Sequence, residues 1–305
     1  MSRLQANLLL LIAAVIWGST FVVQQISMDL IGPMTFTAAR FFLGLLVVAP
    51  LAIREWNKKK QLSNNSGPRP LSNRDLLLML FIGVILFIAT IVQQIGIAHT
   101  SVTNAGFLTA LYVPMVPLLG LIFFRSKPHW IVWIAIAFSF AGTTLISGVD
   151  TSLELGYGDS LILTSSIFWG LHVLLVGVVA ARTSMPLTLA AIQFAVTTII
   201  AAIWALSTET MALAPLLSAF WFIAYAGIVS VGVAFTLQVI GQSHTAPADA
   251  ALILSLETVF AASAGAIFLQ ERIGHTEMIG CAMILSAILM VEVLPMIFRK
   301  KRPFI

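Results

Sequence analysis

Charged residues are scarce in this sequence. Asp, Glu, Lys and Arg make up 9% of its 305 residues, whereas apolar residues make up 59%. A soluble protein of this size needs more charge than this to cover its surface. Apolar stretches of about 20 residues recur along the whole chain, and about 20 helical residues cross the hydrocarbon core of a bilayer. The composition therefore excludes a soluble domain and predicts an all-α integral membrane protein.

Cysteine is almost absent as well. The one thiol, Cys281, lies in an apolar run and has no internal disulfide partner. The sequence has no CxxC, no HExxH and no Cys/His cluster for a metal, no GxxxxGK[ST] loop for ATP, and no GxSxG nucleophile motif. We therefore expect no metal, no cofactor and no catalytic residue, and the chain is not predicted to be an enzyme.

The apolar residues fall into segments that are each long enough to span a membrane. Several connectors are only a few residues long, which makes the adjoining helices antiparallel. The exception is residues 54–74, REWNKKKQLSNNSGPRPLSNR, which are predicted to form a flexible loop because they are polar, basic and rich in Ser, Asn and Pro. The ten predicted spans are 8–27, 34–53, 75–98, 102–123, 129–147, 158–180, 187–206, 216–241, 248–270 and 275–297.

The basic residues predict how these spans are oriented. Cytoplasmic loops carry an excess of Lys and Arg, and an even number of spans puts both termini on one side. With both termini in the cytoplasm, every Lys and Arg except Arg40 and Arg272 falls on the cytoplasmic side. We therefore expect a multi-pass protein of the cell (inner) membrane. The net charge of +4 is then a topology signal, so the expected partners are the lipid bilayer and a small-molecule substrate, not nucleic acid.

The chain repeats itself. GQSHTAPADAAL (241–252) echoes GIAHTSVTNAGF (96–107) at a shift of 145 residues, and Trp169-Gly170 echoes Trp17-Gly18 at a shift of 152. Helices 1–5 therefore correspond to helices 6–10, in two repeats that cover residues 1–149 and 150–305. Because each repeat has an odd number of spans, the second is expected to be inverted. Inverted repeats are typical of secondary transporters, which bind substrate near the midplane between the two halves.

These segments resemble the EamA-type carriers of the drug/metabolite transporter superfamily, over essentially the whole chain. The resemblance implies a secondary transporter that carries a small organic metabolite or drug-like solute across the cytoplasmic membrane by alternating access, in the direction of efflux. The matching segments are AVIWGSTF (14–21), AARFFLG (38–44), QQIGIAHTSVTNAGFL (93–108), GYGDSLILTSSIFWG (156–170) and GQSHTAPADAALILSLETVFAASAGAIFLQE (241–271).

The sequence departs from the pattern of that family in helix 9. The family usually has Glu-Pro and then Leu-Gly-Glu there, whereas this chain has Glu257-Thr258 and Leu269-Gln270-Glu271. The first repeat has Tyr112 at the position of Glu257 and Ser126 at that of Glu271. The second half is therefore expected to carry the more specialised chemistry.

Glu257, Arg40 and His172 are ionisable residues within predicted spans, where an ionisable group costs free energy. Glu257, about 14 Å from the inner end of its helix, is either a structural carboxylic acid or a site for a proton or cation, because burial favours the protonated form. Arg40 either pairs with Glu257 or helix-end carbonyls, or binds a carboxylate or phosphate of the substrate. His172 is either a buried hydrogen-bonding residue or a proton relay.

Several uncharged residues near the midplane are further candidates for contact with a substrate. Trp17, Trp169 and Tyr112 either face a cavity, which would suit an amphipathic or aromatic substrate, or pack against lipid and protein. Gln93 and Gln238 have amides that must face protein or water. Separately, Pro114 and Pro117 are expected to break helix 4 near its centre.

The function is open among three classes at this point. A carrier is the leading hypothesis, since an inverted repeat allows alternating access. A membrane enzyme is an alternative, for which Ser165, Ser166 and His172 form no recognised motif. A channel also fits the spans but makes no particular use of the repeat. The oligomeric state, monomer or homodimer, is undetermined by the sequence.

Overall fold

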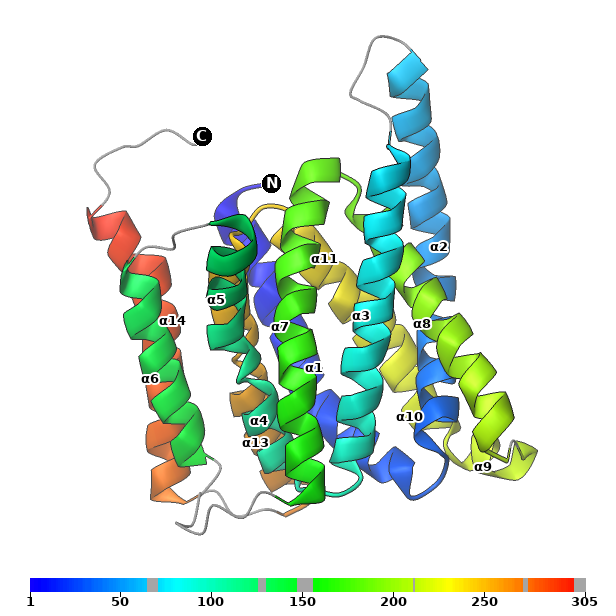
Figure 1. The fold of residues 1–305 in the computed structure, drawn as a ribbon. Coiled ribbons are helices and arrows are strands. Elements are labelled where there is room, and N and C mark those ends of the chain that lie inside the picture. Colours follow the sequence, from blue (N-terminus) through cyan, green and yellow to red (C-terminus); the bar gives the residue numbers. More distant parts are fainter. Residues whose placement is uncertain (65–70, 126–129, 147–155, 211, 271–273, 299–305) are drawn as a thin grey trace.

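The computed structural model describes residues 1–64, 71–125, 130–146, 156–210, 212–270 and 274–298, which are helical with short connections and contain no strand (Figure 1). The predicted boundary at residues 149 and 150 lies outside this part of the chain, as do Ser126, Glu271 and Arg272. The helices are α1 (Arg3–Met28), α2 (Pro33–Asn64), α3 (Asn73–Ile97), α4 (Val102–Thr109), α5 (Tyr112–Phe124), α6 (Trp130–Ile146), α7 (Tyr157–Thr183), α8 (Pro186–Thr208), α9 (Leu213–Ser218), α10 (Phe220–Ala224), the π-helix η1 (Tyr225–Phe235), α11 (Thr236–Gln242), α12 (Pro247–Leu254), α13 (Glu257–Phe268) and α14 (His275–Phe298).

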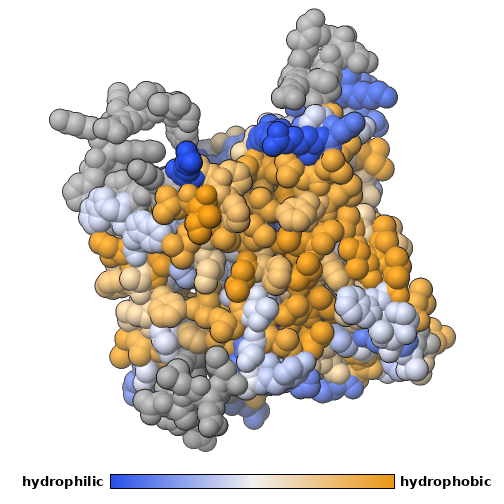
Figure 2. Space-filling model, in the orientation of Figure 1, coloured by the Kyte–Doolittle hydropathy of each residue, from blue (hydrophilic) through white to orange (hydrophobic). Residues whose placement is uncertain are grey.

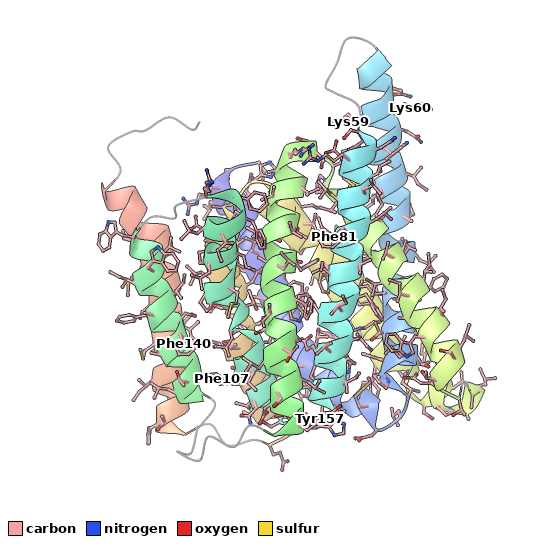
Figure 3. All side chains as sticks on the ribbon, in the orientation of Figure 1. Lys59, Lys60, Phe81, Phe107, Phe140 and Tyr157 are labelled. Atoms are coloured by element: carbon pink, nitrogen blue, oxygen red, sulfur yellow. The ribbon has the colours of Figure 1, made fainter. Side chains whose placement is uncertain are left out.

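The described helices form an apolar bundle with polar ends. Eight continuous or stacked helical segments are long and apolar enough to cross a membrane, and two shorter apolar stretches lie at Trp130–Gly142 and Met278–Ala287. Figure 2 shows hydrophobic residues across the middle of one face and hydrophilic residues at both ends, with the most hydrophilic at one end. Lys59 and Lys60 lie at that end and Tyr157 at the opposite one (Figure 3). The chain is therefore a multi-pass membrane protein.

We call these ends the basic end and the distal end. The basic end holds the N-terminus, the last turns of α2, α5 and α7, and the start of α3 (Figure 1). The distal end holds the start of α7 and the connection from α3 to α4. The basic residues of the described chain that lie at the basic end are Arg3, Arg54, Lys58, Lys59, Lys60, Arg74, Arg125 and Arg182.

Part of the predicted flexible loop, residues 54–74, is helical. α2 continues eleven residues past the predicted end of its span, to Asn64, and α3 begins at Asn73. The apolar pattern stops at residue 53, but the backbone hydrogen bonds of the helix continue to Asn64. The extension is anchored at Lys59, whose ammonium donates to the carbonyl of Thr183 at 3.1 Å.

Two predicted spans, 102–123 and 248–270, are each interrupted near the middle. α4 ends at Thr109 and α5 begins at Tyr112. The break includes Ala110, one turn before Pro114, whose ring nitrogen cannot donate to the carbonyl of Ala110. The break expected from the prolines is thus present. α12 and α13 are separated in the same way at Ser255 and Leu256. No proline lies at this second break, and the sequence did not predict it.

The two interruptions occupy equivalent positions in the repeated sequence. At the first, the backbone N–H of Val113 donates to the carbonyl of Ala110 at 2.9 Å; at the second, that of Thr258 donates to Ser255 at 3.1 Å. A shift of 145 residues takes Ala110 to Ser255 and Val113 to Thr258. The halves therefore share this backbone feature even where their side chains differ.

The predicted span 216–241 is built differently from a single α-helix. It comprises α10, the π-helix η1 and α11, preceded by the short helix α9. In a π-helix each N–H bonds the carbonyl five residues back, which widens the helix, and such segments are rare and frequent at functional sites. The apolar composition of residues 225–235 gave no sign of this widening.

Helices from the two halves pack against each other throughout the bundle. α2 packs along α8, α3 along α7, and α6 along α14 at one edge (Figure 1). Gly18 and Gly170, which are equivalent in the repeats, permit two further close approaches between the halves, that of α1 to α13 and that of α7 to α5. A side chain on Gly18 would collide with Phe260 in α13, and one on Gly170 with Met115 in α5. Phe260 and Met115 are themselves 145 residues apart.

α2 and α8 are joined at both ends by carboxylates. At the basic end, Glu55 accepts hydrogen bonds from the backbone N–H and the hydroxyl of Thr188, both at 2.7 Å. At the distal end, Glu209 accepts from the backbone N–H of Thr35 at 2.8 Å and from its hydroxyl at 2.6 Å. Each carboxylate satisfies free N–H groups at a helix N-terminus, where the helix dipole favours negative charge.

Candidate functional site: a polar cavity between the two halves

A cavity lies inside the bundle, between helices of both halves. The room inside it for the centres of water molecules is about 40 Å³, so the cavity is narrow in this conformation and must widen to admit a small organic ligand. Its walls combine aromatic rings, amides, hydroxyls and two ionisable groups. The lining residues are Trp17, Thr20, Phe21, Gln24, Arg40, Thr90, Gln93, Thr109, Tyr112, Trp169, Val173, Ser230, Phe235, Gln238 and Glu257.

The cavity brings together the candidate residues from the sequence, except for His172. Three pairs of residues that are equivalent in the repeats line it, one member from each half. Gln93 and Gln238 are paired by the shift of 145, as are Tyr112 and Glu257, and Trp17 and Trp169 are paired by the shift of 152. The repeated sequence thus converges on one space, as an internal two-fold relation predicts.

Arg40 enters the cavity from α2 and is only 4% exposed. The sequence suggested a pairing with Glu257 or with helix-end carbonyls, but the guanidinium instead donates to the side-chain carbonyl of Gln24 in α1 at 2.6 Å. Its central carbon lies 5.0 Å from the ring centroid of Phe36 and 5.4 Å from that of Phe41. Neutral groups therefore hold this cation, through a hydrogen bond and cation–π contacts.

Glu257 is the first residue of α13, directly after the helix interruption, and is 5% exposed. The phenol of Tyr112, its equivalent in the first half, lies beside its carboxyl group and interacts with it. The Tyr112 hydroxyl also reaches the carbonyl of Ala251 at 3.5 Å, a long hydrogen bond. The interruptions at residues 110–111 and 255–256 place this acid–phenol pair in the wall of the cavity.

Many polar atoms of the wall lack a partner within the described chain. The indole N–H groups of Trp17 and Trp169, the hydroxyl of Thr90 and both amide atoms of Gln238 are buried without a hydrogen bond. Gln93, in contrast, donates to Thr109 at 2.9 Å. Leaving a buried donor or acceptor unpaired costs about 1–3 kcal/mol each. A bound polar ligand would recover part of that cost.

Aromatic rings form the apolar side of the cavity. The ring of Phe235 lies 4.6 Å from that of Trp17 and stacks on that of Trp169 at 6.0 Å, measured between centroids. The sequence did not single out Phe235, which η1 turns toward the cavity. The wall residues Thr20, Phe21 and Gln24 could have been found, because they follow Trp17 at helical spacing on the same face.

His172 lies behind this wall. It is fully buried, its Nε2 is 2.7 Å from the amide oxygen of Gln193 in α8, and its ring meets that of Trp169 edge-on at 5.7 Å. His172 does not line the cavity. Its contacts are those of a buried hydrogen-bonding residue that supports the indole of Trp169.

A bundle of apolar helices that encloses a polar cavity between two related halves belongs to the class of multi-pass membrane transporters. The comparisons identify the family: the EamA-like transporter family matches residues 4–148 and again residues 156–293. The chain belongs to this family.

Named relatives and a solved structure agree with that assignment. The chain is 30% identical to an uncharacterized transporter of Archaeoglobus fulgidus, over 95% of this chain and 86% of that protein. It is 25% identical to the uncharacterized inner membrane transporter YedA of Escherichia coli K12, over 94% of this chain and 90% of that protein. A crystal structure with 17% sequence identity superposes with a TM-score of 0.75, over 98% of this chain and 100% of the other, which shows a shared fold.

Proposed function

We propose that this protein is a secondary transporter that carries a small organic solute across the cytoplasmic membrane by alternating access. In this proposal, ten transmembrane helices form two inverted five-helix repeats, residues 1–149 and 150–305. The observation that carries it is the cavity wall, in which Gln93 and Gln238, and Tyr112 and Glu257, come from equivalent positions. A site shared by two related halves can face either side when the halves exchange conformations.

The packing of the halves supports the inverted arrangement. Two of the most extensive contacts between the halves join equivalent helices, α2 with α8 and α6 with α14. A third joins α3 with α7. Its counterpart in the repeat is the contact of η1 and α11 with α1, because α1 corresponds to α7 and α3 to η1 with α11. In this scheme α6 and α14, the shorter apolar helices at the edge, are the fifth and tenth spans. Their position away from the cavity suits a role in scaffolding or in contact with a second copy.

The basic end is proposed to face the cytoplasm. The excess of Lys and Arg there supports this orientation through the positive-inside rule, and in this proposal both termini are cytoplasmic. The proposed direction is export, which the family resemblance favours. The proposed partners are a small-molecule substrate and the lipid bilayer.

Flux through purified protein in liposomes tests the proposed function. A carrier gives saturable uptake and counterflow, in which unlabelled solute trapped inside accelerates the entry of labelled solute. Flux without saturation or counterflow would instead indicate a channel, and chemical conversion of the solute would indicate an enzyme. A thermal-shift screen of metabolites supplies the solute for the assay, since a ligand that binds the folded state raises its Tm.

A further inference from the structure

The positive charge of Arg40 has no carboxylate partner among the described residues. The guanidinium is buried, lines the cavity, and is held by Gln24, Phe36 and Phe41, which are all neutral. Glu257 lines the same cavity but interacts with Tyr112. A guanidinium cannot shed its proton under ordinary conditions, and a buried charge is expected to be paired. The missing partner is therefore expected to be an anion that enters the cavity.

The unpaired polar atoms around the cavity are mostly donors. They include the Nε–H of Arg40, the indole N–H groups of Trp17 and Trp169, and the amide N–H of Gln238. Among the fully buried unpaired atoms of the wall, the amide oxygen of Gln238 can only accept, while the Thr90 hydroxyl serves in either role. A ligand that satisfies this wall must therefore bring acceptors, and oxygen atoms with negative charge form the strongest such bonds.

We propose that the cavity binds a small organic oxyanion, with a carboxylate or phosphate group on Arg40 and an apolar body between the aromatic rings. The stacked rings of Trp169 and Phe235, with Trp17 beside them, supply a surface for that body. Gln24 accepts from one guanidinium nitrogen of Arg40, and the Nε–H remains without a partner. This inference rests on the proposed function, because it assigns the substrate class of the same site.

Binding to the purified full-length protein tests the inference without any transport. Isothermal titration calorimetry at pH 7.5 compares four probes with one phenyl body: phenylacetate, phenyl phosphate, the neutral phenylacetamide, and the cation 2-phenylethylammonium. We expect the protein to bind at least one of the two anions about tenfold or more tighter than phenylacetamide. Which anion binds more tightly tells carboxylate from phosphate. Equal or tighter binding of the neutral or cationic probe overturns the inference.

Variants at Arg40 connect the preference to this side chain. Arg40→Met is expected to weaken the binding of the preferred anion about 30-fold or more, because it removes one partner of a buried charge pair. The affinity for phenylacetamide is expected to change by less than about twofold. Arg40→Lys is expected to keep part of the preference. The matched control is Arg182→Met, which removes an arginine that pairs with Asp75 at the basic end, away from the cavity, and is expected to bind like the wild type. Unchanged anion binding in Arg40→Met overturns the inference.

If Arg40→Met does not fold, Trp17→Phe tests the same wall. It keeps an aromatic ring but removes one unpaired N–H, and is expected to weaken the binding of the preferred anion about tenfold. An unchanged affinity contradicts the inference.

The inference and the proposed function can fail separately. If the protein shows saturable counterflow but no preference for anions, the oxyanion assignment is wrong and the carrier function stands. If anions bind in a way that depends on Arg40 but no counterflow occurs, the anion site stands and the carrier function is wrong.

Discussion

Thr100 donates a 2.6 Å hydrogen bond to the carboxylate of Asp159 and so joins the end of α3 to the first turn of α7 at the distal end. The same bond recurs at the basic end, where Thr245 donates to the side-chain oxygen of Asn7 in α1 at 3.0 Å. The shift of 145 takes Thr100 to Thr245, and the shift of 152 takes Asn7 to Asp159. Each bond joins one half to the other, so the same interaction is used once at each end of the bundle.

These two bonds are expected to act as alternate latches. Alternating access requires that one end opens while the other stays closed, so the two bonds should break in different states. Thr245→Val removes the latch at the basic end, and Thr100→Val removes the latch at the distal end. The loss of one hydrogen bond, about 0.5–1.5 kcal/mol, shifts the balance between the two open states up to about tenfold.

Labelling of a cysteine in the cavity measures this shift. Cys281 is first replaced by Ser, and Ser230, which lines the cavity, is replaced by Cys. A thiol reagent that does not cross membranes is then added to one side of proteoliposomes of known orientation. Thr245→Val should speed labelling from the basic end and Thr100→Val from the distal end. Faster labelling of both variants from one side would contradict the assignment of the latches.

The carboxylates of Glu55 and Glu209 are expected to stabilise the pairing of α2 with α8. Each caps the N-terminus of the opposite helix, so Glu55→Gln and Glu209→Gln should each lower the free energy of unfolding by about 1 kcal/mol and the Tm by about 2–4 °C. The control is Asp29→Asn, at an exposed carboxylate at the end of α1, which should leave the Tm unchanged. Thermal unfolding in detergent measures all three, and equal Tm values for caps and control would refute the capping role.

How much of this structure the sequence could predict depends on the kind of interaction. The repeat at 96–107 and 241–252 pairs Gln93 with Gln238 and Tyr112 with Glu257, and all four residues line the cavity. Pro114 predicted the interruption between α4 and α5, since proline removes one helical hydrogen bond. These features are local, and a local pattern in the sequence records them.

Other features depend on contacts between distant segments and left no such record. The interruption at Ser255 has no proline, and the π-helix that turns Phe235 inward has an ordinary apolar composition. The sequence left the partner of Arg40 open among Glu257, helix-end carbonyls and an anionic group of the substrate, because a buried cation needs an acceptor. The contact with Gln24 depends on how α1 packs on α2. His172 shares a helix face with Trp169, yet the neighbouring α8 decides that it points to Gln193 and not to the cavity.

Gly18 and Gly170 provide a test of the equivalent helix approaches. Alanine at either position would overlap Phe260 or Met115 in the neighbouring helix, so Gly18→Ala and Gly170→Ala should each cost about 1–3 kcal/mol of stability. Gly120 in α5 is the matched control, because a Cβ there would meet its nearest neighbour, Leu174, at an ordinary 3.6 Å. Gly120→Ala should raise stability by about 0.5–1 kcal/mol, since alanine favours helix. Chemical denaturation in mixed micelles measures the change in stability of each variant. A similar loss of stability in all three variants would contradict the role of Gly18 and Gly170 in the close helix approaches.

Glu257 is expected to couple transport to protons. Its carboxyl group is buried in the cavity wall beside Tyr112, where a change of protonation changes the charge next to the substrate. Glu257→Gln keeps the shape of the protonated acid but cannot release a proton. It should retain counterflow while losing both the response of uptake to an imposed proton gradient and the dependence of the rate on pH. The matched control is Glu209→Gln, which removes a carboxylate at the distal end, outside the cavity, and should keep both responses. If Glu257→Gln still accumulates solute under a proton gradient with the pH profile of the wild type, the coupling proton binds elsewhere.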